Sequence, residues 1–416
     1  MNLKHLLFAG GALLGATAAQ AGGFQLTLAG QKNNGMGGVG TGLALDQAAM
    51  FYNPGALAMV RERGVQIGVN ATLARQAFRA QYGGAERQLD NTVSTPFNFY
   101  AGFGPAEGKW KAGIGVYTPF GSRLDYADNW EGRTALTSID LKSIFVQPTV
   151  SYALTDQLSV GAGLVVFAAG SVNLQRDIQD PAQGSIELDG KADTKFGWNA
   201  GVYFKPSDKF SLGISHRSKM DAVVSGGDVI ISGVNASLAD RFAARKFDVT
   251  LPLPATTTIG LGVMPTEKLT LGFDVNYATW SRYQELVFNF DAPINGQTVS
   301  RSRREYQDAL TFRLGGQYQV TDALTVRLGG AYDETPVKDG FVTPETPDND
   351  RLTATAGVSY KFGERFGIDV SAQYVNIAKR TQTQEQLQNN GVATDRVAGT
   401  YKTVAVVPGF GLNYNF

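Results

Sequence analysis

Residues Phe24–Val60, FQLTLAGQKNNGMGGVGTGLALDQAAMFYNPGALAMV, decide the fold of this 416-residue chain. The stretch is too rich in glycine and polar residues to be a strand or a membrane helix, and its glycines let backbone pass where side chains would clash. Its pattern predicts a short helix over 44–52, which the Asn53-Pro54-Gly55 turn ends. We therefore predict that residues 22–62 form a hatch, a plug inside a structure built by the rest of the chain.

Residues 1–21 precede this stretch and have the pattern of a signal peptide. Lys4 is the basic residue, Leu6–Leu14 the apolar core, and Ala19-Gln20-Ala21 the small-residue cleavage site. The apolar run is too short to span a bilayer, so the pattern favours a signal peptide over a buried N-terminal helix. We expect the mature protein to begin at Gly22.

The composition excludes several classes of protein. With 37 basic and 37 acidic residues the chain is neutral, so we expect no nucleic-acid partner. No apolar run beyond residue 21 reaches the ~18 residues that a membrane helix needs. The chain has no cysteine, and His216 is the only histidine after the leader. We therefore expect no metal site built on Cys or His, no cofactor and no enzyme activity. His216 shares the parity of Leu212 and Ile214, which predicts a place at the lipid interface rather than in a catalytic triad.

Residues 63–416 consist of alternating apolar and polar segments of about ten or more residues, separated by polar turns. This period of two predicts an all-β membrane fold, an antiparallel transmembrane β-barrel of about 14 strands plugged by the N-terminal hatch. Short turns alternate with longer polar segments at 122–138, 177–192, 227–244, 336–350 and 380–396, which we expect to be outer loops, with Asp348-Asn349-Asp350 as solvated acidic residues rather than a cation site. The predicted strands are 64–74, 94–104, 109–121, 139–153, 158–176, 193–206, 209–226, 245–264, 268–291, 303–319, 323–335, 351–362, 367–379 and 397–416.

Charged residues within the predicted strands should face the lumen, because a charge on the lipid face costs ~2–4 kcal/mol at the membrane midplane. An apolar pocket that ends in a lumenal arginine would suit a carboxylate ligand, so Arg313 and Arg327 are candidates for that contact. Structural pairing of these arginines with lumenal carboxylates is slightly favoured over a ligand role. The predicted lumenal charges are Arg217, Asp274, Arg313, Arg327 and Asp333.

Two stretches are candidates for a transport route. Phe24, Leu26 and Leu28 could fill an apolar ligand pocket, unless they simply begin an ordinary strand. In the third predicted strand a proline deletes a ladder hydrogen bond, and hydrocarbon tolerates that only where the wall opens or protein covers the gap. The alternative is a harmless bend at the membrane edge. The residues of this candidate opening are Tyr117, Pro119, Phe120 and Gly121.

The order of several motifs resembles the FadL family, the outer-membrane transporters of long-chain fatty acids, with its toluene and xylene branch. The motifs are the leader, the Gly-rich segment, Asp46-Gln47-Ala48-Ala49, Asn53-Pro54-Gly55-Ala56-Leu57, Phe196-Gly197-Trp198-Asn199-Ala200-Gly201, Ala278-Thr279-Trp280-Ser281 and Tyr332-Asp333-Glu334-Thr335-Pro336. Gly55 departs from the family's usual Asn-Pro-Ala. The resemblance implies a kink in the third strand that opens the wall sideways, with Pro119 as its counterpart here.

The resemblance also implies a function. We expect a passive transporter in the outer membrane of a Gram-negative bacterium, in contact with outer-membrane lipid and lipopolysaccharide. Its ligands would be hydrophobic small molecules, first long-chain fatty acids, which would pass from an outer pocket past the hatch and leave through the wall. The alternatives are an aromatic-hydrocarbon channel of the same family, or a general porin or structural barrel.

Overall fold

A computed structural model of the chain describes residues 24–90, 93–105, 108–127, 129–179, 182–393 and 396–416. The predicted signal peptide lies outside them. The strands form one antiparallel sheet that closes on itself, because the first strand pairs with the last from Gly64↔Asn415 to Asn70↔Gly409. Fourteen passes of the described chain build this closed barrel, as predicted. At the level of closure the strands are β1 (Gly64–Asn70), β5 (Phe97–Phe103), β6 (Trp110–Tyr117), β8 (Ser138–Ala153), β9 (Leu158–Asp177), β11 (Lys195–Ser207), β12 (Phe210–Arg217), β15 (Thr256–Thr266), β16 (Leu269–Ala278), β19 (Ala309–Gln319), β20 (Leu324–Asp333), β21 (Arg351–Phe362), β22 (Phe366–Gln382) and β23 (Gly399–Asn415).

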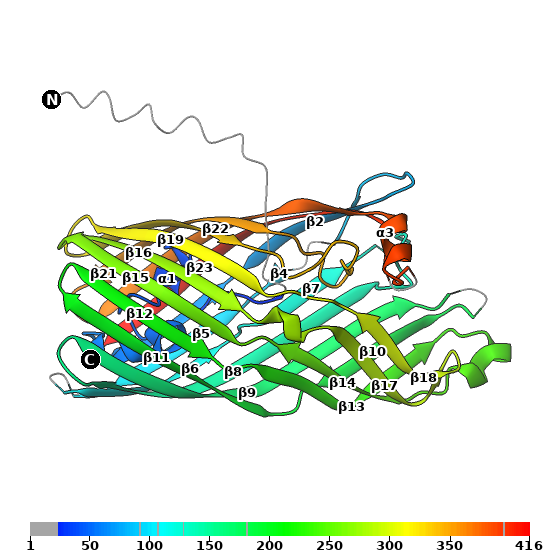
Figure 1. The fold of residues 1–416 in the computed structure, drawn as a ribbon, viewed down its shortest axis with the longest axis horizontal. Helices are drawn as coiled ribbons and strands as arrows, with labels where there is room; N and C mark the ends of the chain where they lie inside the picture. The colour runs from blue at the N-terminus through cyan, green and yellow to red at the C-terminus, as the bar shows by residue number, and fades with distance from the viewer. Residues whose placement is uncertain (1–23, 91–92, 106–107, 128, 180–181, 394–395) are drawn as a thin grey trace, which may run out of the picture.

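Further strands continue these passes beyond that level and lengthen the wall. In Figure 1 they lie toward the end opposite the C terminus, which places the short turns at the C-terminal end. They are β2 (Thr72–Ala80), β3 (Arg87–Gln88), β4 (Val93–Ser94), β7 (Gly121–Asp125), β10 (Ser185–Lys191), β13 (Met220–Ser232), β14 (Lys246–Leu253), β17 (Glu285–Ile294) and β18 (Gln297–Arg303). Short helices η3 (Ala236–Arg241), η4 (Trp280–Arg282) and α3 (Gln384–Asn389) connect strands at or above this level.

The two faces of each strand differ as a lipid-facing wall requires. In β21, Leu352, Val358 and Tyr360 are about half exposed and point outward. Thr353 and Ser359 alternate with them and are buried inside the barrel. Apolar side chains on the outer face suit hydrocarbon, and polar ones inside meet other protein groups. Among the described residues no helix is long and apolar enough to cross a membrane.

Residues 24–60, here called the inner segment, lie against the inner faces of the wall strands and carry the short helices α1 (Gln31–Asn34), α2 (Ala49–Tyr52) and η2 (Pro54–Met59). In Figure 1 the segment is blue and lies among the strands near the C-terminal end. Gln31 donates to the Asn70 side chain (3.1 Å) and accepts from Ser371 Oγ (2.6 Å). Wall glycines allow a close approach, since a Cβ on Gly315 would lie 2.1 Å from the Met36 carbonyl oxygen.

Three expectations, two about the connecting segments and one about the helix of the inner segment, are wrong. Segments 122–138, 177–192 and 227–244 are not plain loops, because β7, β10 and the end of β13 continue the wall there. The helix expected over 44–52 is only the four residues of α2. Segment 336–350 folds inward, where Val342 is fully buried and Asp348 is 5% exposed. The Asp348 carboxylate accepts from Thr335 Oγ1 (3.0 Å), so this acidic residue is enclosed rather than solvated.

Candidate functional site: a gap in the barrel wall

The barrel wall is interrupted between its second and third passes. β5 pairs with β6 up to Asn98↔Tyr117, and beyond that point β7 pairs only with β8 among the described residues. On the other side, β4 pairs with β2. A backbone hydrogen bond from the Asp90 amide to the Asp125 carbonyl (3.0 Å) joins the two sides again further up. We call the region between these two connections the wall gap.

The sequence at Thr118-Pro119 accounts for the interruption. Proline has no amide hydrogen, and the residue before a proline is sterically restricted, so the ladder of β6 ends at Tyr117. The next amide, that of Phe120, donates to Ser143 Oγ (3.2 Å) on β8, and this hydroxyl donates back to the Phe120 carbonyl (2.5 Å). The chain then resumes as β7, with one edge that no neighbouring wall strand covers in the described part of the barrel.

The first residues of the inner segment lie on this uncovered edge. We call residues 24–26 the bolt. They supply from inside the barrel the backbone pairing that the neighbouring wall strand does not provide. The contacts are a hydrogen bond from the Leu26 amide to the Pro119 carbonyl (2.8 Å), one from the Gly121 amide to the Phe24 carbonyl (3.2 Å), and the antiparallel bridge Gln25↔Phe120 between them.

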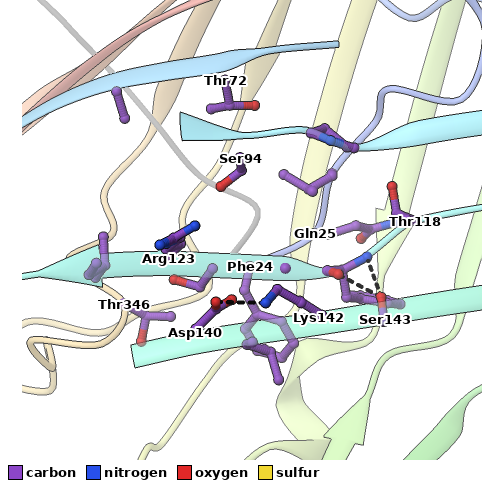
Figure 2. A pocket seen from close by; sticks show the side chains of 18 of the residues that line it. Phe24, Gln25, Thr72, Ser94, Thr118, Arg123, Asp140, Lys142, Ser143 and Thr346 are labelled. Carbon is purple, nitrogen blue, oxygen red and sulfur yellow. Dashed lines mark hydrogen bonds and ion pairs between the residues drawn. The ribbon is translucent and has the colours of Figure 1, made fainter. Parts of the chain in front are cut away.

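A cavity of about 380 Å³ lies at the wall gap, and this volume is typical of a small-molecule site. Figure 2 shows Thr72 and Ser94 on one side of it and Phe24 on the other. On the β8 side, Lys142 and Asp140 form an ion pair of 2.8 Å. The predicted site residues Leu26, Phe120 and Gly121 line the same cavity.

A second, apolar cavity of about 90 Å³ lies inside the upper barrel, and we call it the apolar chamber. Six residues line both cavities and so form the boundary between the chamber and the wall gap: Phe24, Ser122, Leu141, Lys142, Glu345 and Thr346. Phe24 is the only one of them that the inner segment supplies. The Phe24 ring packs 5.2 Å from the Trp280 ring and 5.8 Å from the Phe120 ring, measured between centroids. The chamber is lined by inward side chains of the upper strands, among them Ile139, Leu174, Val224, Val249, Leu251 and Phe288.

Tyr117 and Arg217 lie below the wall gap and join the wall to the inner segment. The Tyr117 hydroxyl donates to Gln147 Oε1 (2.5 Å) and accepts from Arg217 Nη1 (2.7 Å). Arg217 Nη2 also donates to the Phe51 carbonyl (3.2 Å), and the guanidinium lies 4.9 Å from the centre of the Phe51 ring. Arg217 therefore faces the lumen and holds α2 in place.

The Asn53-Pro54-Gly55 turn fastens the inner segment to the wall rather than lining either cavity. Asn53 is fully buried and donates to the carbonyls of Thr41 (2.8 Å) and Val202 (3.0 Å). A Cβ on Gly55 would lie 2.6 Å from the Gly201 carbonyl oxygen, so a glycine suits the place where the family usually has alanine. The turn therefore lies against the backbone of β11 without space for a larger side chain at position 55.

The remaining predicted residues occupy separate places. Leu28 packs against Ala405 and Val407 of β23 and lines neither cavity. His216 lies beside Trp198, with 5.2 Å between the ring centroids. Because Trp198 is half exposed on the outer face, this contact agrees with the interfacial position expected for the histidine.

The predicted lumenal charges are not one cluster. The Asp274 carboxylate accepts from the amides of Gly40 (2.9 Å) and Thr41 (3.0 Å) and so holds the inner segment. Arg313 lines a polar cavity of about 50 Å³ that Asp274 also lines. Arg327 donates to Gln317 and Ser359 and lines a different polar cavity, and Asp333 accepts from Thr311 Oγ1 (2.8 Å). In the described part of the chain no ion pair within 4.0 Å joins either arginine to Asp274 or Asp333, so the favoured pairing is not found.

Sequence reasoning missed several residues of the site. Arg351 begins β21 and lines the cavity at the wall gap, and its buried Nε has no hydrogen-bond partner among the described residues. The alternation of β21 places it on the inner face with Thr353, which is a signal that the sequence contains. Trp280 and Tyr283 surround Phe24, but they follow a break in the strand pattern, so no periodicity points to them.

Taken together, the wall, its gap and the enclosed segment define a plugged outer-membrane β-barrel with a small-molecule cavity at its side. The model of one family, the outer membrane protein transport proteins (OMPP1/FadL/TodX), matches residues 12–416. The chain belongs to this family. It is an outer-membrane protein of the Gram-negative type, and the resemblance and location predicted from the sequence are confirmed.

Individual relatives are distant but cover the chain. Outer membrane protein P1 of Haemophilus influenzae is 25% identical, over 100% of this chain and 99% of its own. The long-chain fatty acid transport protein of Escherichia coli is 24% identical, over 75% of this chain and 74% of its own. Among solved structures, a Pseudomonas aeruginosa FadL homologue has a TM-score of 0.82 at 21% identity, covering 95% of this chain and 100% of its own. The P. putida toluene transporter TodX has a TM-score of 0.70 at 15% identity, covering 96% and 99%. These likenesses establish a shared fold.

Proposed function

We propose that this member of an outer-membrane family of hydrophobic-compound transporters carries long-chain fatty acids by passive diffusion. Residues 1–21 would be a signal peptide, 22–62 the hatch and 63–416 the barrel. Ligand would enter the apolar chamber from outside, pass the bolt and leave sideways through the wall gap into the outer leaflet. The observation that carries this route is the position of Phe24. Its side chain lines both cavities, and its backbone pairs with the uncovered edge at Pro119–Gly121.

The route requires little movement. The bolt is joined to the kinked edge by two backbone hydrogen bonds, whereas the rest of the inner segment is fastened through Asn53, Asp274 and Arg217. A ligand that pushes against the Phe24 ring would release only residues 24–26. The chamber and the wall gap would then join, and the barrel would keep its plug. No energy source beyond the ligand gradient is needed for such a step.

The carboxylate of a fatty acid needs a cation along this path. Arg351 meets that need better than Arg313 or Arg327, because it lines the cavity at the wall gap and its Nε lacks a hydrogen-bond partner among the described groups. Its neighbour across the ladder, Asp333, accepts from Thr311 instead. Arg313 lies in the polar cavity behind the bolt and remains a second candidate for the same contact.

An aromatic-hydrocarbon channel is the second candidate function, because two proteins of similar fold are named toluene transporters and the chamber is lined by apolar side chains. Such ligands carry no charge and would not depend on Arg351. A general porin would instead conduct small ions. The close fit of the inner segment, with Met36 fully buried against wall glycines, weighs against an open pore.

Closing the wall gap tests the route. A side chain at position 121 would point toward Leu26, since a Cβ there lies 3.6 Å from Leu26 Cδ1. We expect the variant Pro119→Ala with Gly121→Tyr to lose most uptake of labelled oleate in cells without another transporter. Pro408→Ala is the matched control, because Pro408 lies in β23 opposite Ala372 in an uninterrupted ladder. Unchanged uptake by the double variant would refute lateral exit.

Binding by the purified protein tests the ligand class. We expect Arg351→Ala to weaken oleate binding at least tenfold and to leave toluene binding unchanged, since a charge-assisted hydrogen bond contributes about 1.5–3 kcal/mol. Arg327→Ala is the control, because this residue lines a cavity at the other end of the inner segment. If the unaltered protein binds toluene but does not bind oleate, the result favours the hydrocarbon branch.

A further inference from the structure

We propose that the outer face of β2, β22 and β23 binds the phosphate groups of lipid A, the membrane anchor of lipopolysaccharide. Four exposed cationic side chains gather there, and we call them the cationic patch. This inference concerns a membrane lipid outside the barrel and does not depend on what the barrel transports. The patch consists of Arg75 and Arg79 on β2, Lys379 on β22 and Lys402 on β23.

The strand register brings these side chains together. Arg75 lies opposite Val404, and Arg79 lies opposite Thr400. Lys402 lies opposite the residue between the two arginines, so both arginines are its diagonal neighbours, at roughly 7–8 Å between Cα atoms. Lys379 falls in the bulge of β22 that faces Lys402. The four cations therefore form one continuous patch across three neighbouring strands.

The patch lies at the level of lipid headgroups. Leu73 is the outward residue that precedes Arg75 on β2, on the side of the membrane centre. It lies opposite Val406, and both side chains are 45% exposed. Tyr374, opposite Val406, is 51% exposed. These side chains mark the edge of the apolar band, where an aromatic residue is typical of the membrane interface. Cations directly beyond that edge stand where the phosphates of an outer-leaflet lipid would lie.

The cations of the patch lack protein partners, unlike others on the outer wall. In the described part of the chain no hydrogen bond or ion pair of their side chains is found, whereas the exposed cations Lys246, Arg301 and Arg303 pair with carboxylates within 2.9 Å. The adjoining segment carries Glu86, Arg87 and Asp90. Glu86 accepts from Gln88, and Arg87 pairs with Glu131 (3.0 Å).

Neighbouring like charges on a sheet repel one another unless an anion lies between them. The four unpaired cations of the patch form a positive surface that a doubly phosphorylated lipid can neutralise through charge-assisted hydrogen bonds. The same strand that carries Arg75 outward turns Thr72, Ala74 and Gln76 toward the cavity at the wall gap. A lipid held by the patch would therefore lie directly beside the gap.

Native mass spectrometry of the purified full chain in detergent tests the proposal. The probes are diphosphoryl lipid A and the same lipid with both phosphates removed. At ~1 kcal/mol for each surface cation, the variant Arg75→Ala, Arg79→Ala, Lys402→Ala should bind diphosphoryl lipid A about 100-fold more weakly. The dephosphorylated lipid should bind the unaltered protein as weakly as diphosphoryl lipid A binds the patch variant.

The matched control is Lys246→Ala, Arg301→Ala, Arg303→Ala, which removes the same charge from exposed, paired positions and should keep its affinity. Both variants are first checked for folding: a folded barrel migrates differently on a gel before and after heating. Equal loss in both variants, unchanged binding by the patch variant, or equal binding of the two lipids would overturn the proposal. Oleate binding should be unchanged in the patch variant, so this test is separate from that of transport.

Discussion

A disulfide between positions 25 and 120 should fix the bolt to the uncovered edge at Pro119–Gly121. Because the hydrogen bonds on either side join the flanking residues, Gln25 and Phe120 are the non-hydrogen-bonded pair of their bridge, with Cα atoms about 4.5 Å apart. A disulfide accepts Cα separations of about 4.4–6.8 Å. The chain contains no cysteine, so Gln25→Cys with Phe120→Cys can form only this intramolecular bond.

The expected effect follows from what holds the bolt. Two backbone hydrogen bonds contribute about 1 kcal/mol each, and burial of the Phe24 ring contributes about 2 kcal/mol. A total of about 4 kcal/mol corresponds to release in about one molecule in a thousand. The disulfide removes this released population, so oxidised protein should carry no labelled oleate into lipid vesicles above background.

Reduction supplies the internal control, because the reduced variant should regain transport. The variant Gln25→Ser with Phe120→Ser loses the same side chains and should transport equally with and without reductant. Transport by the fully oxidised cysteine variant at the rate of the reduced one would refute the reasoning, since ligand would then pass without displacing the bolt.

Two further predictions concern the plug and the inward-folded segment. Gly315→Ala should destabilise the packed inner segment by about 1–3 kcal/mol, because its Cβ would meet the Met36 carbonyl oxygen at 2.1 Å, and it should increase protease cleavage of that segment. Gly316→Ala, on the lipid-facing side, should have little effect. Burial alone would raise the pKa of Glu345, but Arg304 and the charge of Arg396 hold this pKa below its usual range. The stabilisation by Glu345 is therefore present above the pKa of the unfolded chain and is lost as pH falls through the lower folded-state pKa. Proteolysis of segment 336–350 should rise on acidification, and Glu345→Gln should remove that pH dependence.

The strands could be predicted because hydrocarbon restricts the outer face of every pass. β21 has both ends where the alternation placed them, since Leu352 through Tyr360 must present apolar groups to lipid at every second position. Beyond the apolar band that restriction ends. In β10 the outward residues Glu187 and Asp189 meet water, so the segment resembles a polar loop in sequence although it is a wall strand.

The candidate site was partly predictable for a similar reason. Pro119 marks a missing hydrogen bond within a single stretch of sequence, so the kink could be found. The bolt could not, because its contact with Phe120 joins residues about a hundred positions apart and depends on how the bore is filled. Segment 336–350 also gave no sign of turning inward. Its charges are satisfied by groups from other strands, as when Asp350 accepts from the Tyr332 hydroxyl.

The pairing of β1 with β23 also constrains how the protein is assembled. The inner segment leaves the export machinery first, yet the strand that completes its surroundings is the last to arrive. Wall glycines such as Gly315 touch the segment so closely that it could not enter a finished cylinder. It follows that the pairing of β1 with β23 closes the cylinder around a segment that is already in place.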